Sequence, residues 1–150
     1  MTKYAARTEV PSSRSRNEIE RVLTRYGATS FMSGWDEGQA VIGFVIHDRQ
    51  VRFVLPLPDP QDRAFTRSET GRARSAAVAQ KAYEQAVRSA WRSLLLIIKA
   101  KLEAVESGIV EFDTEFLANL VLPNGQTVGS QVLPAARQAM ESGSLLELTQ

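Results

Sequence analysis

The stretch from Ser75 to Glu106 constrains the fold more than any other part of the chain. It contains no Gly or Pro and is rich in Ala, Leu, Gln, Lys and Glu, so it predicts one helix of about 48 Å. Gly108 follows it and predicts a left-handed cap. Its apolar residues recur at every third or fourth position and form one stripe that must be covered: Tyr83, Val87, Trp91, Leu94, Ile98, Leu102 and Val105.

The middle of this helix is apolar all round. Leu94 to Ile98 are five consecutive apolar residues, which predicts burial on every side at that level. The helix is also longer than a 150-residue domain needs. We therefore expect part of it to project or to pair with another subunit, which predicts a homo-oligomer formed through Ser75 to Glu106.

The N-terminal part predicts a flexible arm followed by a short helix. Residues 1–14 are polar and without periodicity, which is typical of a mobile arm. Ser15 and Glu18 have the spacing of a capping box, and Gly27 predicts the end of the helix. The buried face between them is predicted from helical spacing to consist of Ile19, Val22, Leu23 and Tyr26.

Three strands should follow as an antiparallel meander. Alternation begins after Ala28, and Gly34 to Gly38 predicts the first turn, with Trp35 in it. The second strand, Gln39 to His47, has apolar residues on both faces, which is typical of a strand covered on both sides. A third alternating run extends from Val51 to Leu57.

The remainder predicts helices and a small hairpin. Residues 112–120 have helical spacing, Asn124-Gly125 is a strong hairpin signal, and Ser130 to Met140 predicts a last helix. The fold class is therefore α+β, with the helices packed on one face of the sheet. We expect one domain over residues 15–143 and a tail over 144–150.

Composition excludes several functional classes. The chain has no cysteine and one histidine, His47, so it offers neither a thiolate site nor a two-histidine metal site within one chain. Nucleotide-binding glycine motifs and the serine-hydrolase elbow are absent from the sequence. We expect a non-enzymatic protein without cofactor or metal. The N-terminus has no apolar signal core and no apolar run spans a membrane, which predicts a cytoplasmic protein with no membrane partner.

Arginines concentrate before the long helix. They precede a helix N-terminus, where free amides and the helix dipole favour an anion. The alternative is a solvated loop in which they pair with Asp59, Asp62 and Glu69. An aromatic ring beside them could stack on a base. The candidate ligand-binding residues are Trp35, Arg52, Arg63, Arg67, Arg72, Arg74, Tyr83 and Arg88.

Three segments, ERVLTRYGATSFMSGWDEGQAVIGFVIHDRQVRFVLPLPD, TGRARSAAVAQKAYEQAVRSAWRSLLLIIKAKLEAVESGI and EFLANLVLPNGQTVG, resemble an uncharacterised family of short proteins encoded by phages and prophages. The resemblance implies a phage setting and assigns no activity. Because small phage proteins without catalytic motifs often counter host defence, the leading hypothesis is a protein that sequesters a small phosphorylated immune signal. The alternatives are a nucleic-acid-binding accessory of phage replication or recombination, for which a net charge of +1 is low, and an inhibitor that binds a host protein.

Overall fold

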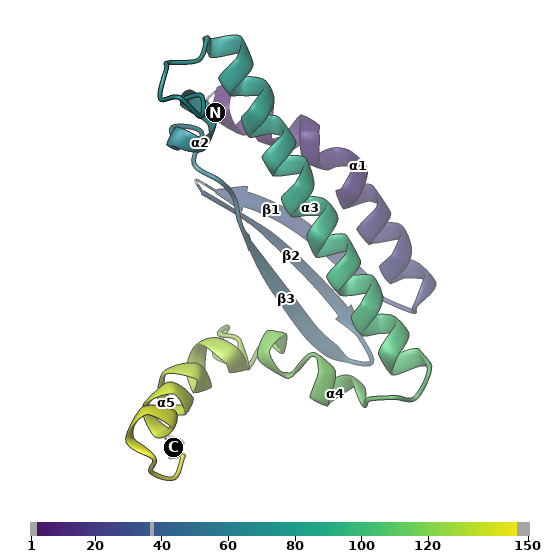
Figure 1. The fold of residues 1–150 in the computed structure, drawn as a ribbon. Coiled ribbons are helices and arrows are strands. Elements are labelled where there is room, and N and C mark those ends of the chain that lie inside the picture. The colour runs from purple at the N-terminus through teal and green to yellow at the C-terminus, as the bar shows by residue number, and fades with distance from the viewer. Residues whose placement is uncertain (1–2, 37, 147–150) are drawn as a thin grey trace.

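A computed structural model of the chain describes residues 3–36 and 38–146, with side chains from residue 13 onward. It confirms the α+β class and the expected order of elements (Figure 1). The elements are α1 Lys3–Arg25, β1 Ser30–Asp36, β2 Gln39–Ile46, β3 Arg49–Pro56, α2 Arg63–Thr66, α3 Ala76–Glu106, α4 Phe112–Glu115, the 3-10 helix η1 Leu117–Asn119 and α5 Val128–Ser142.

The three strands form the expected antiparallel meander, in the order β1-β2-β3. Ile42 of β2 lies opposite Ser33 on one side and Phe53 on the other. Helices α1 and α3 lie side by side over one face of this sheet (Figure 1). Burial therefore alternates along β2, with Ala40, Ile42, Phe44 and Ile46 buried beneath the helices.

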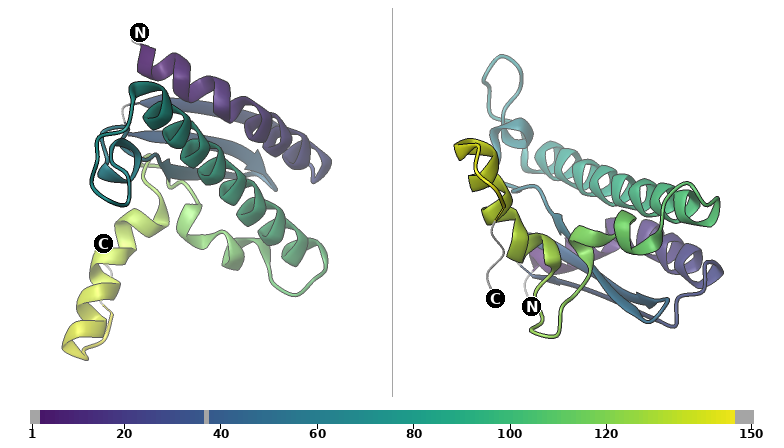
Figure 2. Two further views of the ribbon diagram at one scale, coloured as in Figure 1. Left: turned by 45° about the horizontal axis from the view of Figure 1, so that its top comes forward. Right: turned by 90° about the horizontal axis from the view of Figure 1, so that it is seen from below.

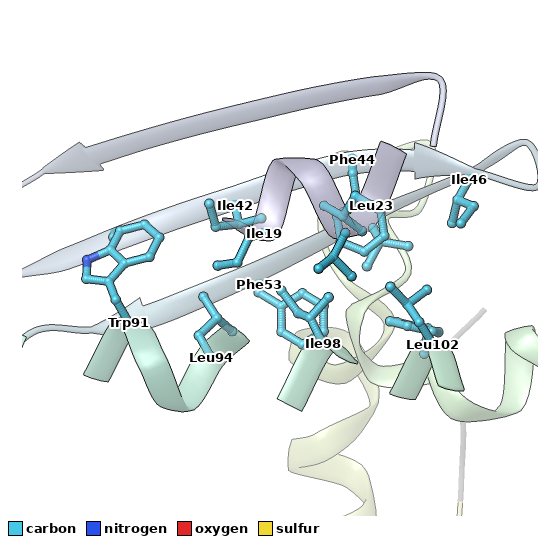
Figure 3. Packing of buried hydrophobic residues seen from close by; sticks show 14 of the residues in the cluster. Ile19, Leu23, Ile42, Phe44, Ile46, Phe53, Trp91, Leu94, Ile98 and Leu102 are labelled. Atoms are coloured by element: carbon cyan, nitrogen blue, oxygen red, sulfur yellow. The ribbon is translucent and has the colours of Figure 1, made fainter. Parts of the chain in front are cut away.

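The core lies between these two layers. From α3, Trp91, Leu94, Ile98 and Leu102 point toward Ile42, Phe44, Ile46 and Phe53 of the strands, and Ile19 and Leu23 of α1 complete the cluster (Figure 3). All the predicted stripe residues of α3 up to Leu102 are buried, and Val105 is partly buried. The hydrophobic periodicity of α3 therefore predicted its inward face correctly.

Both ends of α3 are fixed locally. The Ser75 hydroxyl accepts a hydrogen bond from the Val78 amide, which satisfies one of the free donors of the first turn. At the other end Gly108 has φ of 80° and Ile109 N donates to Ala104 O, the bond that closes a Schellman cap. The cap predicted at Gly108 is confirmed.

The expectation that α3 is buried on all sides at its middle is wrong. Leu96 is 59% exposed and Ile97 is 47% exposed. The sheet and α1 cover α3 from one side, and no described element lies on its outer side (Figure 2, left). Two of the five consecutive apolar side chains, those of Leu96 and Ile97, are therefore exposed to solvent.

Helix α1 begins at Lys3, so the predicted start at Ser15 is wrong. Ser15 lies inside the helix and cannot form the capping box with Glu18. Its end is as predicted, because Gly27 has φ of 98° and Ala28 N donates to Leu23 O. The Tyr26 hydroxyl then donates to a Glu103 carboxylate oxygen at 2.8 Å, which ties the end of α1 to α3.

The C-terminal segment leaves the helix layer and crosses to the edge of β3. Val121 N donates to Gln50 O, and Leu120 bridges Val51. Leu122 and Gln126 then close the predicted Asn-Gly turn. Beneath α3, the buried Phe116 ring contacts Phe44 and Phe53.

Helix α5 starts at Val128, two residues earlier than predicted, and Pro134 lies inside it. It packs against η1 and extends away from the sheet, so the expected packing of the last helix on the sheet is not found (Figures 1 and 2). Of the expected tail, residues 147–150 lie outside the described residues. In the part of the chain that the structure describes, no helix is long and apolar enough to cross a membrane.

Candidate functional site

The arginine-rich segment folds into two small units before α3. Asp62 caps α2 by accepting a hydrogen bond from Ala64 N at 2.8 Å. Residues 67–73 then form a narrow hairpin, in which Ser68 N donates to Arg72 O at 2.8 Å. The left-handed conformation at the hairpin tip is taken by Gly71, whose φ is 85°. The chain returns to start α3 at once, which brings the segment beside that helix N-terminus (Figure 1).

A hollow of about 740 Å³ lies between the residues around α2 and the first two turns of α3. Alanines and Tyr83 supply its apolar wall, and one arginine and several amide or hydroxyl side chains supply its polar groups. The lining residues are Pro60, Gln61, Thr66, Arg74, Ala76, Ala77, Ala79, Gln80 and Tyr83.

Arg74 is the charged residue of this hollow. Its side chain is half-buried, and its Nη1 approaches the carbonyl oxygens of Ala64 and Phe65 at 3.4 and 3.5 Å. These bonds use one of its nitrogens, and a guanidinium carries five N–H donors. The lining residues Ala76 and Ala77 belong to the first turn of α3, where amides have no partner within the helix. Arginine donors and helix amides therefore meet at the same hollow.

Three further arginines lie in the same segment and do not line the hollow. Arg63, on α2, and Arg67 and Arg72, on the hairpin, are all exposed. Arg67 Nη1 donates to the Gly71 carbonyl at 3.4 Å, so this bond helps close the hairpin. Together with Arg74 they place four guanidinium groups next to the N-terminus of a 31-residue helix.

The arginines do not form the ion pairs with nearby carboxylates that the alternative interpretation of the sequence expected. Among residues 3–36 and 38–146, none of the ion pairs involves one of the four arginines. The two aspartates instead accept hydrogen bonds from backbone amides. Asp59 accepts one from Gln61 N at 2.9 Å, and Asp62 accepts one from Ala64 N at 2.8 Å. The positive charge of the segment is therefore not neutralised by the ion pairs that the sequence suggested.

Two predicted ligand residues lie elsewhere. Arg52 is on the sheet face away from α3, and its Nη2 donates to the Gly125 carbonyl at 2.6 Å. It holds the C-terminal turn against β3 and does not line the hollow. Arg88, on α3, is exposed and donates to Gln85 Oε1 at 2.9 Å. It does not line the hollow either.

The aromatic residues are packed more tightly than expected. Trp35 belongs to β1, pairs with Ala40 and packs against the core, so the expectation that it lies in a turn is wrong. Tyr83 is 1% exposed and its ring meets Phe65 edge-on at 5.9 Å between centroids. Tyr83 lines the hollow as part of its wall, and core packing covers most of the ring.

Several lining residues carried no signal of their own in the sequence. Gln61, Thr66 and Gln80 are polar residues of ordinary types, and they reach the hollow because α2 folds back on α3. Only their nearness to the arginines along the chain could have suggested them.

The groups with shifted pKa values lie at the opposite end of α3. A hydrogen bond from Arg49 lowers the pKa of Asp113, with Nε and Nη2 each 3.0 Å from a carboxylate oxygen. The bond to Glu103 raises the pKa of Tyr26. Both pairs join surface elements far from the arginine segment. Within the described residues, no three His, Cys, Asp or Glu side chains converge as metal ligands would.

Comparison of the chain with models of known protein families, with curated proteins and with solved structures finds no match. The resemblance to short phage proteins therefore stays a prediction, and a functional assignment must rest on the geometry of the arginine segment.

Proposed function

We propose that this protein is a non-enzymatic binding protein for a small phosphorylated ligand of nucleotide type. One observation carries the proposal: Arg74 lines a hollow at the N-terminus of the long helix α3, and the segment that leads into this helix carries three more arginines that form none of the ion pairs described. Guanidinium groups and the free amides of a helix N-terminus both favour phosphate oxygens. Arg74 binds from within the hollow, and Arg63, Arg67 and Arg72 neutralise charge at its rim.

The dimensions of the hollow agree with such a ligand. Its volume of about 740 Å³ falls within the roughly 300–1,000 Å³ of small-molecule sites. The apolar wall of alanines and Tyr83 suits the flat face of a base or a ribose carbon surface, and Gln61 and Gln80 suit its polar edge. Arg52, Arg88 and Trp35 have no part in this site.

In a phage setting, tight binding without turnover would sequester a signal of host immunity in the cytoplasm of the infected bacterium. Leu96 and Ile97 are exposed on the outer side of α3 and are available for contact with another protein. The same two residues would serve a protein that inhibits a host factor by direct contact.

The proposal is tested by titration calorimetry with two probes, ADP and inorganic pyrophosphate, at two salt concentrations. The double variant Arg63→Glu/Arg72→Glu breaks no side-chain bond described here and should weaken ADP binding by on the order of 100-fold, since a hydrogen bond to a charged group contributes about 1.5–3 kcal/mol. Arg92→Glu, exposed on α3 outside the hollow, is the matched control. Equal affinities for both variants and the unchanged protein would contradict the proposal.

Arg74 needs a milder change because it also contacts the carbonyls of α2. Arg74→Lys keeps the charge and loses the planar fork, so it should weaken ADP binding while the melting temperature stays nearly constant.

The dependence of binding affinity on salt concentration distinguishes the nucleic-acid alternative from the proposed function. A ligand with two phosphates releases few counterions, so its affinity should fall only slightly as salt rises, whereas nucleic acid predicts a steep fall. A steep dependence with DNA or RNA and no ADP binding would replace the proposal by that alternative.

A further inference from the structure

The sheet has one face that no described element of the chain covers. Helices α1 and α3 pack on the other face (Figure 1). The centre of the open face is apolar and is formed by Met32, Gly34, Val41, Gly43, Val45 and Val54. Met32 is 69% exposed and Val54 is 50% exposed.

Most polar residues of this face lie at the strand ends, and the exception is Arg52, which stands opposite Gly43 in β3 and lines the hollow of this face. Asp36 stands at the end of β1, and Arg52 turns to the Gly125 carbonyl. An apolar centre with a polar rim is the arrangement found in protein interfaces. The face also lacks aromatic rings, so it offers no platform on which bases could stack.

The dimensions of the open face suit a single helix. Its strands have seven or eight residues, a length of about 25 Å, and three strands are about 10–14 Å wide. Gly34 pairs with Val41 and Gly43 pairs with Met32, so the two glycines lie diagonally across β1 and β2, where they line a shallow hollow of about 290 Å³. A helix has a diameter of about 10 Å, so one helix fills the face.

Helix α5 has the complementary features. Its 15 residues give a length of about 22 Å, close to that of the strands. At 100° per residue, its apolar side chains other than Pro134 fall on one half of the helix, with Val132, Leu133, Ala136 and Met140 among them, and Arg137 and Glu141 fall outside that half. None of its residues is buried, and Met140 is 73% exposed. An amphipathic helix of this kind normally covers an apolar surface.

The helix is held away from the sheet of its own chain. Gly129 sits so close to η1 that a Cβ there would lie 2.8 Å from the Ala118 carbonyl oxygen. Val128 N also donates to Leu120 O, and Arg52 anchors the preceding turn. These contacts direct α5 outward (Figure 2).

We infer that this protein forms a reciprocal dimer in which α5 of each copy covers the open sheet face of the other. Both surfaces belong to the same chain, so a two-fold axis can form both contacts at once. Reciprocity doubles the buried area, which brings it toward the roughly 1,200–2,000 Å² of stable interfaces. The contact uses neither the arginine hollow nor the exposed face of α3.

The first test is the mass of the full-length protein by light scattering at micromolar concentration. The unchanged protein should have twice the chain mass of 16.6 kDa. Ala136→Asp, on the apolar half of α5, should halve the observed mass while the circular dichroism spectrum is retained. Gln138→Asp, on the polar half, is the control and should remain dimeric. A monomeric unchanged protein would overturn the inference, as would a dimer that survives Ala136→Asp and is broken by Leu96→Asp.

The second test uses the absence of native cysteine. Met32→Cys and Met140→Cys proteins are mixed and treated with a short bis-maleimide linker, which should join a sheet cysteine of one chain to an α5 cysteine of the other. Met32→Cys mixed with Gln138→Cys should cross-link at least ten-fold less. Equal yields from the two mixtures would overturn the proposed orientation of α5.

Discussion

An alanine at position 129 should loosen α5, although alanine is the better helix former. The new Cβ would stand 2.8 Å from the Ala118 carbonyl oxygen and 3.4 Å from its carbonyl carbon. Both are backbone atoms, so they cannot rotate aside as a side chain would. Overpacking of this kind costs about 1–3 kcal/mol, against a gain of up to about 1 kcal/mol from helix propensity. We expect a net loss of about 1 kcal/mol.

The loss should be local. Because α5 has no buried residue and packs against η1, its undocking leaves the core between the sheet, α1 and α3 intact. Hydrogen exchange should therefore become about five-fold faster for amides of α5, as expected for about 1 kcal/mol, while the melting temperature changes little.

The direction in which Gly129→Ala changes hydrogen exchange in α5 tests this reasoning. If the close approach to Ala118 did not exist, Gly129→Ala would slow exchange in α5, because alanine favours the helix. Unchanged or slower exchange would therefore refute the reasoning. Gln138→Ala serves as the control on the exposed side of the same helix. The double variant Gly129→Ala/Ala118→Gly should not recover protection, since the carbonyl oxygen of residue 118 remains in place.

Three further predictions concern the sheet, the core and the surface. Asp48→Gly should raise the free energy of unfolding in urea by about 0.5–1 kcal/mol, because Asp48 has φ of 61° in the β2–β3 turn; a decrease would contradict this. Ile98→Ala should lower it by about 2–5 kcal/mol and Leu96→Ala by less than about 0.5 kcal/mol, since Ile98 is fully buried and Leu96 is 59% exposed; similar losses would be inconsistent with the packing of α3. An NMR titration should find the pKa of Asp113 below 3.8, so the bond from Arg49 stabilises the fold above that pH and is lost as pH falls through the lower folded pKa. Arg49→Gln should return this pKa toward 3.8, and an unaltered value would show that Arg49 is not the cause.

The sequence predicted the elements whose signals are local. The stripe of α3 and the glycines at 27 and 108 act within one or two turns of helix, and all are found as expected. The meander was also predicted, because alternation and turn residues are read over a few positions.

The errors arise where tertiary contacts decide the outcome. Leu96 and Ile97 remain exposed because the sheet and α1 cover only one side of α3. The start of α1 was placed too late because residues 1–14 are polar and without periodicity and were therefore interpreted as a mobile arm. Trp35 was placed in a turn because Gly34 and Gly38 were interpreted as the limits of that turn. Trp35 and Asp36 are in fact the last two residues of β1.

The candidate site was predicted in part. The arginines were found from their concentration before α3, and the hollow beside Arg74 required knowledge of how α2 folds back. Arg52 could have been separated from the others in the sequence, because it alternates with Val51 and Phe53, which face the helices. Its side chain must then point to the opposite face of the sheet.

The most direct test of the proposed function is native mass spectrometry of the protein purified gently from phage-infected bacteria that carry a nucleotide-signalling defence. The unchanged protein should retain a nucleotide-sized mass, the Arg63→Glu/Arg72→Glu variant should lose it, and Arg92→Glu should keep it. Ligand-free spectra for all three proteins would contradict the proposal that the arginine hollow binds a phosphorylated ligand.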